Sequence, residues 1–192
     1  MIINYFKRRR YLFIFFSVLF IIGMITGIVI YLKLDNNIKL NLINNLTNFK
    51  EDIINNRLNP INNHIFLLFL SCVLTLTVIG YFYGLFYFFY EGMSISFTSM
   101  YLCLNYGLKG LIFSILYNIC FKLLFLILFC LVLDKLFNFL SYIICYIFHK
   151  KCNITLKKTI LSVIILSVFI ILNDLIIFFF GNYLVKILIF VL

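Results

Sequence analysis

The stretch that decides the fold is residues 85–110, LFYFFYEGMSISFTSMYLCLNYGLKG. It begins as an uncharged apolar segment, meets Glu91 and Gly92, passes through a part rich in serine and threonine, and ends on residues 107–110, GLKG. A membrane-spanning helix needs only the apolar part. Irregular backbone at membrane depth is tolerated only where it is buried in protein or lines a polar cavity. The stretch therefore predicts a broken membrane helix with specific packing around Gly107–Gly110.

The rest of the composition is also that of a membrane protein. Of the 192 residues, 65% are hydrophobic and 11% are charged. Soluble domains are about half apolar, so the excess must face lipid. A spanning helix takes roughly 20 apolar residues, which allows about five spans in this chain. The expected fold is all-α: a single membrane domain, residues 1–192, built as a polytopic helix bundle. The expected spans are residues 11–32, 65–90, 94–117, 119–148 and 159–180.

Basic residues without carboxylates precede the first and the last of these spans. They are the run KRRR at residues 7–10 and the lysines within residues 150–158. The positive-inside rule places both clusters, and so the N-terminus, in the cytoplasm of a multi-pass cell-membrane protein, with the polar loop 33–63 outside. Anionic membrane lipid is the expected partner of these charges. A nucleic-acid partner is not expected, because the charges flank spans instead of lining a folded surface.

The outer loop, residues 33–63, is rich in asparagine but carries a helical pattern. Its apolar residues recur at steps of three or four, the spacing of one face of a helix, and Pro60 marks the end of the pattern. We expect an amphipathic helix that lies on the outer membrane surface or docks a partner. The residues of this stripe are Ile38, Leu42, Leu46, Phe49 and Ile53.

Two pairs of glycines are spaced for close helix packing. Gly23 and Gly27 lie in the first span, and Gly80 and Gly84 in the second. Small residues four apart leave one helix face flat, so that a neighbouring helix can approach. We expect these two faces to pack against each other or against a neighbouring protein.

Polar residues interrupt the apolar runs after Glu91. We expect two crossings between residues 91 and 149, forming a hairpin whose outer tip is at Tyr117–Asn118. An ionisable residue inside a membrane indicates function or pairing by default, although a long side chain can also reach the interface. The last span is expected to end at Gly181–Asn182. The polar candidates in these spans are Asn118, Lys122, Asp134 and Asp174, together with Lys109 in the expected break.

Two motifs carry a resemblance to a known family. Residues 91–98, EGMSISFT, and residues 105–113, NYGLKGLIF, are similar to the stage II sporulation protein M pattern Gly-x-Ser-x-Gly-Phe-Thr followed by Gly-Leu-Lys-Gly. Ser96 stands where the family has glycine, and Asp174 lies about one turn before the family's acidic position, so the chain resembles a divergent member. The matching residues are Glu91, Gly92, Ser94, Phe97, Thr98, Gly107, Lys109 and Gly110.

The resemblance implies a non-enzymatic membrane scaffold. Members of the family act in the sporulation septum, where they anchor stage II sporulation proteins D and P, and the complex remodels peptidoglycan during engulfment. We therefore expect partners of this kind, leave a homo-oligomer open, and expect no cofactor, metal or catalytic residue. The residues agree with this expectation, because the chain has no G-x-S-x-G, H-E-x-x-H or Walker A motif and its six cysteines form no C-x-x-C pair.

Two other classes stay open. A permease subunit would use the broken helix with Lys109, Lys122 and Asp134 as a path for a solute or ion, and it would need a separate ATPase. An intramembrane aspartyl protease would use Asp134 and Asp174. The sequence lacks the glycine-rich motif that should flank such aspartates, which makes this class the weakest.

Overall fold

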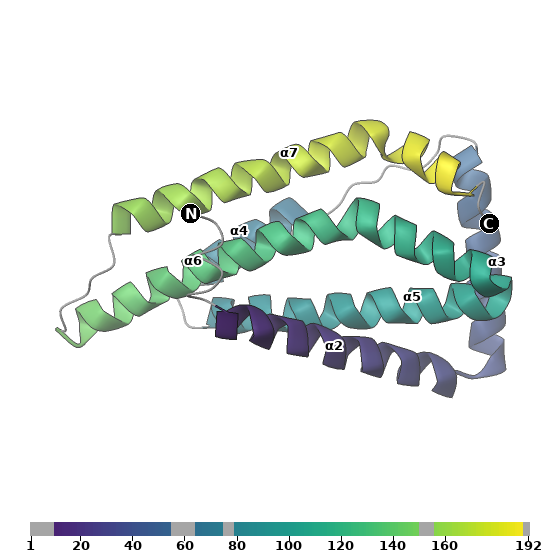
Figure 1. Ribbon diagram of the computed structural model, residues 1–192, viewed down its shortest axis with the longest axis horizontal. Coiled ribbons are helices and arrows are strands. Elements are labelled where there is room, and N and C mark those ends of the chain that lie inside the picture. The colour runs from purple at the N-terminus through teal and green to yellow at the C-terminus, as the bar shows by residue number, and fades with distance from the viewer. Residues whose placement is uncertain (1–9, 55–63, 75–78, 150–155, 190–192) are drawn as a thin grey trace.

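A computed structural model describes residues 10–54, 64–74, 79–149 and 156–189, and these form helices with almost no other structure (Figure 1). The expected all-α class is confirmed. Three helical segments are long and apolar enough to cross a membrane: Phe13–Lys33, Phe82–Ile147 and Leu156–Gly181. The elements are α2 (Arg10–Lys33), α3 (Asn36–Ile54), α4 (His64–Leu74), α5 (Ile79–Asn118), the π-helical turn η1 (Ile119–Leu123), α6 (Leu124–Ile147) and α7 (Leu156–Ile189).

Helix α5 reverses direction inside its own boundaries. Gly107 has φ 62° and ψ −142°, a non-helical conformation between two helical stretches. Only glycine adopts such angles without strain, because it has no Cβ. The first arm, residues 79–106, and the return arm, residues 108–147, consequently lie antiparallel as a helical hairpin (Figure 1). The expected break near Gly107–Gly110 is confirmed in position.

The expected tip of the hairpin at Tyr117–Asn118 is wrong. Both residues lie within the return arm, where the chain continues through η1 into α6 without leaving a helical conformation. The expected boundary between spans 94–117 and 119–148 therefore falls in mid-arm. The physical reason is that the side-chain amide of Asn118 donates to the carbonyl oxygen of Ser114 at 2.8 Å. A polar group that is satisfied inside the bundle does not need to reach water.

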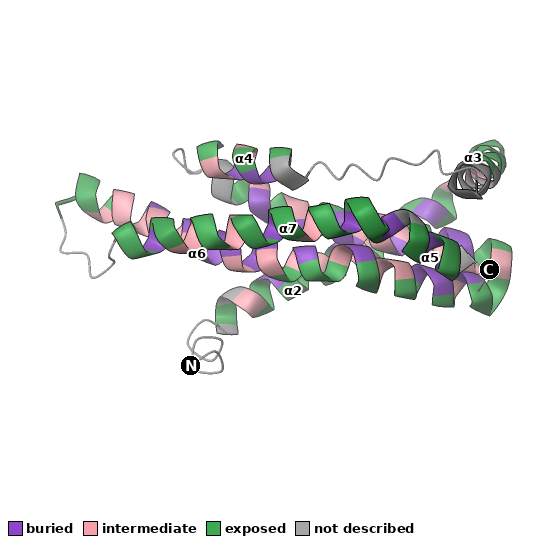
Figure 2. Cartoon of the chain, turned by 90° about the horizontal axis from the view of Figure 1, so that it is seen from above, coloured by how far each residue is buried: buried purple, intermediate pink, exposed green. Residues whose placement is uncertain are grey.

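Residues 65–90 do not form the single helix that their unbroken hydropathy predicts. They are divided between α4 and the beginning of α5, and the two helices lie side by side (Figures 1 and 2). Leu67 and Leu68 of α4 are buried in the same core cluster as Leu85 and Phe88 of α5. A continuous apolar run carries no turn signal, so hydropathy alone merges two packed helices into one.

Helix α7 also differs from the expectation, because it continues beyond Gly181 to Ile189. Val185 and Leu188, in the additional turns, are buried in the core. Burial of these side chains against the bundle favours helix beyond the glycine, which costs a helix only about 1 kcal/mol relative to alanine.

The buried side chains form two clusters along the bundle. The first core cluster includes Phe16, Phe88, Phe129 and Ile170, and the second includes Tyr31, Tyr101, Phe113, Ile177 and Val185. Figure 2 shows the buried positions where the helices meet and exposed positions along the outer face of α7. Those exposed positions carry large apolar side chains, among them Ile164, Phe169 and Phe179. Such a surface suits lipid.

Helix α3 lies across the end of the bundle, near the hairpin tip (Figure 1). Its helical conformation, expected from the stripe spacing, is confirmed. The hydroxyl of Tyr101 donates to the carbonyl oxygen of Leu42 at 2.8 Å, and the Leu42 side chain packs against the second core cluster. Ile38 is exposed. The side chains of Leu46, Phe49 and Ile53 lie outside the described residues.

Candidate functional site

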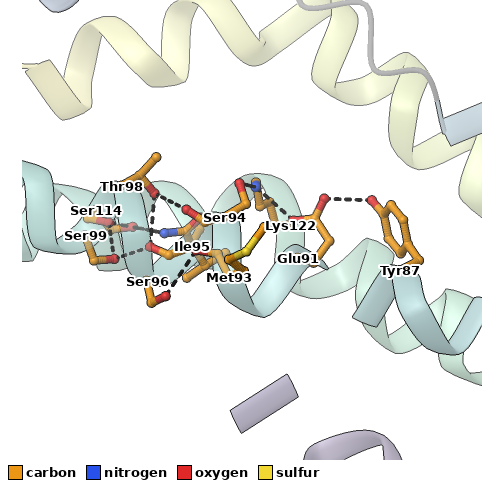
Figure 3. A network of polar contacts seen from close by, with 11 residues as sticks. Tyr87, Glu91, Met93, Ser94, Ile95, Ser96, Thr98, Ser99, Ser114 and Lys122 are labelled. Carbon is orange, nitrogen blue, oxygen red and sulfur yellow. Dashed lines mark hydrogen bonds and ion pairs between the residues drawn. The ribbon is translucent and has the colours of Figure 1, made fainter. Parts of the chain in front are cut away.

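An ion pair joins the two arms of the hairpin near the middle of their length. The ammonium of Lys122, in η1, lies 2.9 Å from a carboxylate oxygen of Glu91, in the first arm (Figure 3). The other carboxylate oxygen of Glu91 accepts a hydrogen bond from the Tyr87 hydroxyl at 2.8 Å. Ser94 accepts a longer contact from Lys122 at 3.4 Å. Each charge therefore has an opposite charge and at least one further polar contact.

The next turns of the hairpin carry a directed chain of hydrogen bonds. The Oγ atoms of Ser99 and Ser114 are 2.7 Å apart, and the amide of Asn118 donates to Ser114 Oγ at 3.2 Å. Ser99 donates its single proton to the carbonyl oxygen of Ile95 at 2.7 Å, so Ser114 must be the donor to Ser99. The order is Asn118 to Ser114 to Ser99 to Ile95, with every hydroxyl proton used.

Together these side chains form one polar seam between the arms, which we define by its residues. It follows the facing sides of both arms because its members recur at steps of three to five on the first arm and four on the return arm. Figure 3 shows the labelled side chains in a row along the hairpin. The polar seam consists of Tyr87, Glu91, Ser94, Ser99, Ser114, Asn118 and Lys122.

The seam is partly buried, and apolar rings flank its Tyr87 end. The Glu91 side chain is 11% exposed and that of Lys122 is 26% exposed. Tyr87 packs edge-on against Phe125 and Phe129 of α6. In such surroundings each charge depends strongly on its partner, because desolvation of a lone buried charge is not compensated. The arrangement can hold the two arms in a single register.

Lys122 lies within a π-helical turn of the return arm. Residues 119–123 form η1 within an otherwise α-helical arm, and Phe121 of this turn is buried in the second core cluster. A π-turn is wider than an α-turn and shifts the faces of the residues that follow it. Such turns occur frequently at functional sites, and here the turn lies where the ion pair forms.

Close backbone packing holds α2 against the first arm. A Cβ added at Gly23 would overlap the carbonyl oxygen of Phe89, and one added at Gly27 would overlap that of Met93. From the other side, a Cβ on Gly92 would overlap the carbonyl oxygen of Phe20. Both helices therefore contribute glycine to one contact, and the partner of the first glycine pair is the region around Gly92.

The second glycine pair meets a different neighbour. A Cβ on Gly84 would overlap the side chain of Leu133 in α6. Gly80 lies in the first turn of α5, and the atoms around it lie outside what the structure describes. Among the glycines whose surroundings the structure describes, the two faces therefore do not pack against each other. One serves the contact of α2 with the first arm, and the other the contact between the arms.

The structure separates the family-like motif into two places. Glu91 and Ser94 belong to the polar seam, whereas Gly107 and Lys109 lie at the exposed hairpin tip. Gly110 lies where a Cβ would overlap the carbonyl oxygen of Leu102, so it allows the arms to converge next to the tip. Of two further motif residues, Phe97 packs edge-on to Tyr31, and the exposed Thr98 donates to carbonyl oxygens of its own helix.

The two aspartates expected in the membrane are not part of the polar seam. Asp134 is fully buried in α6, about 18 Å along the arm from Lys122. Asp174 is half-buried in α7, next to Asn173, whose side-chain nitrogen is buried without a hydrogen bond to any described group. Within the described residues, no three His, Cys, Asp or Glu side chains come together as a metal site requires.

Sequence reasoning missed the pairing of Glu91 with Lys122 and the roles of Tyr87, Ser99 and Ser114. The signal was present, because two opposite charges in apolar segments can each offset the cost of the other. Folding the chain about Gly107 brings them level, since each is about 16 residues from that glycine. Comparison with protein-family models, curated proteins and solved structures finds no match to this chain.

Proposed function

We propose that this chain crosses the membrane five times with its N-terminus in the cytoplasm. Four of these crossings would be α2, the first arm, the return arm and α7, and the fifth would include α4. The three long apolar segments and the lipid-like outer face of α7 support this proposal. So does the KRRR run before α2, by the positive-inside rule.

Labelling of single cysteines tests this topology in a variant that lacks the other cysteines. The tip residue Leu108 is 78% exposed, and we expect Leu108→Cys to react with an impermeant maleimide added outside intact cells. Native Cys152, which lies outside the described residues, should react only after the cells are opened. Labelling of Cys152 from outside would reverse the proposed orientation of the second half.

We further propose that the protein is a non-enzymatic scaffold that holds a partner at its outer end. The observation that carries this is helix α3, which lies across the bundle end and is fixed there by the Tyr101–Leu42 hydrogen bond. Leu40 of this helix is 59% exposed and Ile38 is 46% exposed. A fixed helix with exposed apolar side chains and exposed asparagines offers a surface of mixed polarity, which suits a protein partner.

The nature of the partner is proposed from the sequence resemblance. The stage II sporulation protein M pattern implies wall-remodelling proteins similar to stage II sporulation proteins D and P, at the sporulation septum. In the proposed topology α3 and the hairpin tip lie on the outer side, where peptidoglycan is. The motif glycine Gly107 forms the turn at the hairpin tip, and Gly110 allows the arms to converge beside it.

A pull-down from membranes tests the scaffold proposal. The double variant Ile38→Ser with Leu40→Ser removes two exposed apolar contacts, each worth roughly 1.5 to 3 kcal/mol if a partner buries it fully. Recovery of a wall-remodelling protein should collapse while the amount of inserted protein stays normal. The matched control Asn36→Ser with Asn37→Ser changes exposed polar positions of the same helix and should retain the partner. Equal recovery in both double variants would contradict the proposal.

A permease subunit that works with a separate ATPase is the second candidate. The partly buried Glu91–Lys122 pair favours it, because charged residues between membrane helices often mark a path for an ion or solute. Under this alternative, replacing both residues with methionine abolishes solute uptake while the partner at α3 is still recovered. Under the scaffold proposal, the same variant leaves uptake unchanged.

A further inference from the structure

An apolar groove runs between α2 and the return arm. It encloses about 570 Å³, with Phe13, Phe20 and Met24 of α2 on one side, Leu126 and Leu131 of α6 on the other, and Phe88 of α5 between them. A second cavity of about 240 Å³ shares Phe20, Met24 and Leu126 with it and continues the groove toward the hairpin tip.

The walls of the main groove offer no polar group that needs a partner. Ser17 is the polar residue of the lining, and its hydroxyl donates to the carbonyl oxygen of Phe13 at 3.0 Å. The remaining lining residues are apolar or, in the case of Cys130, only weakly polar. An occupant must therefore be apolar along its whole length here.

The form of the groove favours a flexible chain over a helix. Helices pack closely in membranes through small residues that let their backbones approach. The described glycines of α2, Gly23 and Gly27, are already used in the contact with α5, and the groove is lined by bulky side chains such as Phe13 and Leu131. A second copy of this chain or a partner helix would find no flat face there.

The length of the groove and the charges near it indicate which kind of hydrocarbon chain fits. Phe13 and Met24 are separated by eleven helical steps, or about 16 Å. Half of the hydrocarbon core of a bilayer is about 15 Å, the depth of one leaflet. Arg10 begins α2 just before the groove, and Lys7, Arg8 and Arg9 precede it in sequence. Basic residues at this position attract anionic head groups.

We propose that this groove binds one acyl chain of an anionic phospholipid from the leaflet on the N-terminal side, with the head group at the level where α2 begins and the anionic preference set by the basic run at residues 7–10. The inference rests on the membrane insertion put forward under the proposed function. It adds a defined lipid site at the contact between α2 and the hairpin. A lipid held there would brace α2 against the return arm.

The absence of tryptophan from the chain makes a direct test available. Ile127→Trp places a single fluorescent reporter on the groove lining, and Leu124→Trp places one on the same helix outside that lining. The two positions are 51% and 50% exposed. The full-length variants are reconstituted in phosphatidylcholine that contains a minor fraction of phosphatidylglycerol, with bromine on the acyl chains of one lipid or the other as quencher. Ile21→Trp and Ile22→Trp repeat the comparison on α2, where only Ile21 lines the groove.

The groove reporters should be quenched by brominated phosphatidylglycerol well beyond its fraction in the bilayer, and the control reporters in proportion to it. Arg10→Gln should lower this preference by up to about fivefold. Equal quenching at groove and control positions would overturn the proposal, because the groove would then hold bulk lipid. Weaker quenching in the groove would also overturn it, since protein would cover the site. No quenching at any position would instead refute the membrane insertion itself.

Discussion

Glu91 and Lys122 show how two costly residues become compatible with an apolar interior. Each would be expensive alone, but their ion pair, the Tyr87 hydroxyl and Ser94 provide polar contacts for both. Breaking a buried pair by removing one partner costs about 3–5 kcal/mol, whereas replacing both with apolar residues is often neutral. The effect of a substitution here should therefore depend on whether the partner is still charged.

We predict that Glu91→Met and Lys122→Met each destabilise the protein by about 3–5 kcal/mol, and that the double variant recovers most of the loss. Thermal unfolding in mild detergent measures the three variants. Lys109→Met is the matched control, because Lys109 is exposed at the hairpin tip and should behave like the wild type. A Lys122→Met variant as stable as Lys109→Met would show that the pair contributes nothing.

Gly107 is required for its backbone angles alone, because no atom lies within 4 Å of the place where its Cβ would be. Gly107→Ala should cost about 1–3 kcal/mol of stability. Gly107→Asn should not rescue it, since the left-handed conformation that asparagine tolerates has ψ near +47°, far from −142°. The same unfolding assay checks both variants, with Leu108→Ala at the exposed tip as control. Wild-type stability of Gly107→Ala would argue against a sharp turn here.

The sequence indicates which single residues need a special environment, but not where in the fold each of them finds it. The sequence marks Gly107 as a break because of the GLKG pattern, and the structure has its turn there. Lys109 was expected in the break, inside or near the membrane with its side chain able to reach the interface, and it lies exposed at the tip. Hydropathy indicates that a lysine in an apolar segment needs water or a partner, but only the fold decides which. Lys109 reaches the surface, and Lys122 finds Glu91.

At the scale of elements, the interhelical glycine contacts differ in whether the neighbouring atoms can move to accommodate a side chain. Gly23 and Gly27 of α2 face backbone carbonyl groups of α5, whereas Gly84 faces the flexible side chain of Leu133. Backbone cannot move without displacing a helix, but a leucine side chain can change rotamer. The contact between α2 and the first arm should therefore be the less tolerant of the two.

We predict that Gly23→Ala and Gly27→Ala lower the stability of the bundle more than Gly84→Ala does. Interhelical contacts in membranes are worth about 0.6–2 kcal/mol each, so the comparison needs mild detergent. Adding Leu133→Val to Gly84→Ala should restore stability by making room. It would not be expected to do so for Gly27→Ala, which Leu133 does not contact. An equal loss in all three single variants would contradict the distinction.

The helices themselves were predictable where the sequence pattern is compatible with only one structure. The basic run followed by apolar residues indicates α2, and the stripe that includes Ile38 and Leu42 indicates α3. The division of residues 65–90 into α4 and α5 was not predictable, because their apolar run is continuous. Nor was the extension of α7 past Gly181, since burial of Val185 and Leu188 against the bundle decides it.

At the scale of the whole molecule, the polar seam lies between two apolar clusters. Phe88 and Phe125 belong to the first core cluster, Phe121 belongs to the second, and Phe97 packs against the second. Glu91 and Lys122 lie between these residues along their arms. Apolar packing alone would tolerate a sliding of one arm along the other. An ion pair and a directed hydrogen-bond chain tolerate only one register, so we infer that the seam specifies the hairpin.

The class of the fold and the charge pattern of the whole chain were readable from composition. The hairpin register was not, because hydropathy is nearly constant from residue 111 to residue 133 apart from Asn118 and Lys122. A turn at Tyr117–Asn118 and a turn at Gly107 both leave apolar arms of spanning length. The two differ in which residues face each other, and a contact measurement can detect that difference.

Cysteine cross-linking in membranes tests this register most directly. In a variant without native cysteines, Ser99→Cys with Ser114→Cys should form a disulfide on mild oxidation, because the two Oγ atoms are 2.7 Å apart. Ser99→Cys with Leu136→Cys is the pair that a turn at Tyr117–Asn118 would bring level, and it should stay reduced. A disulfide in the second pair and none in the first would contradict the hairpin about Gly107 and the polar seam built on it.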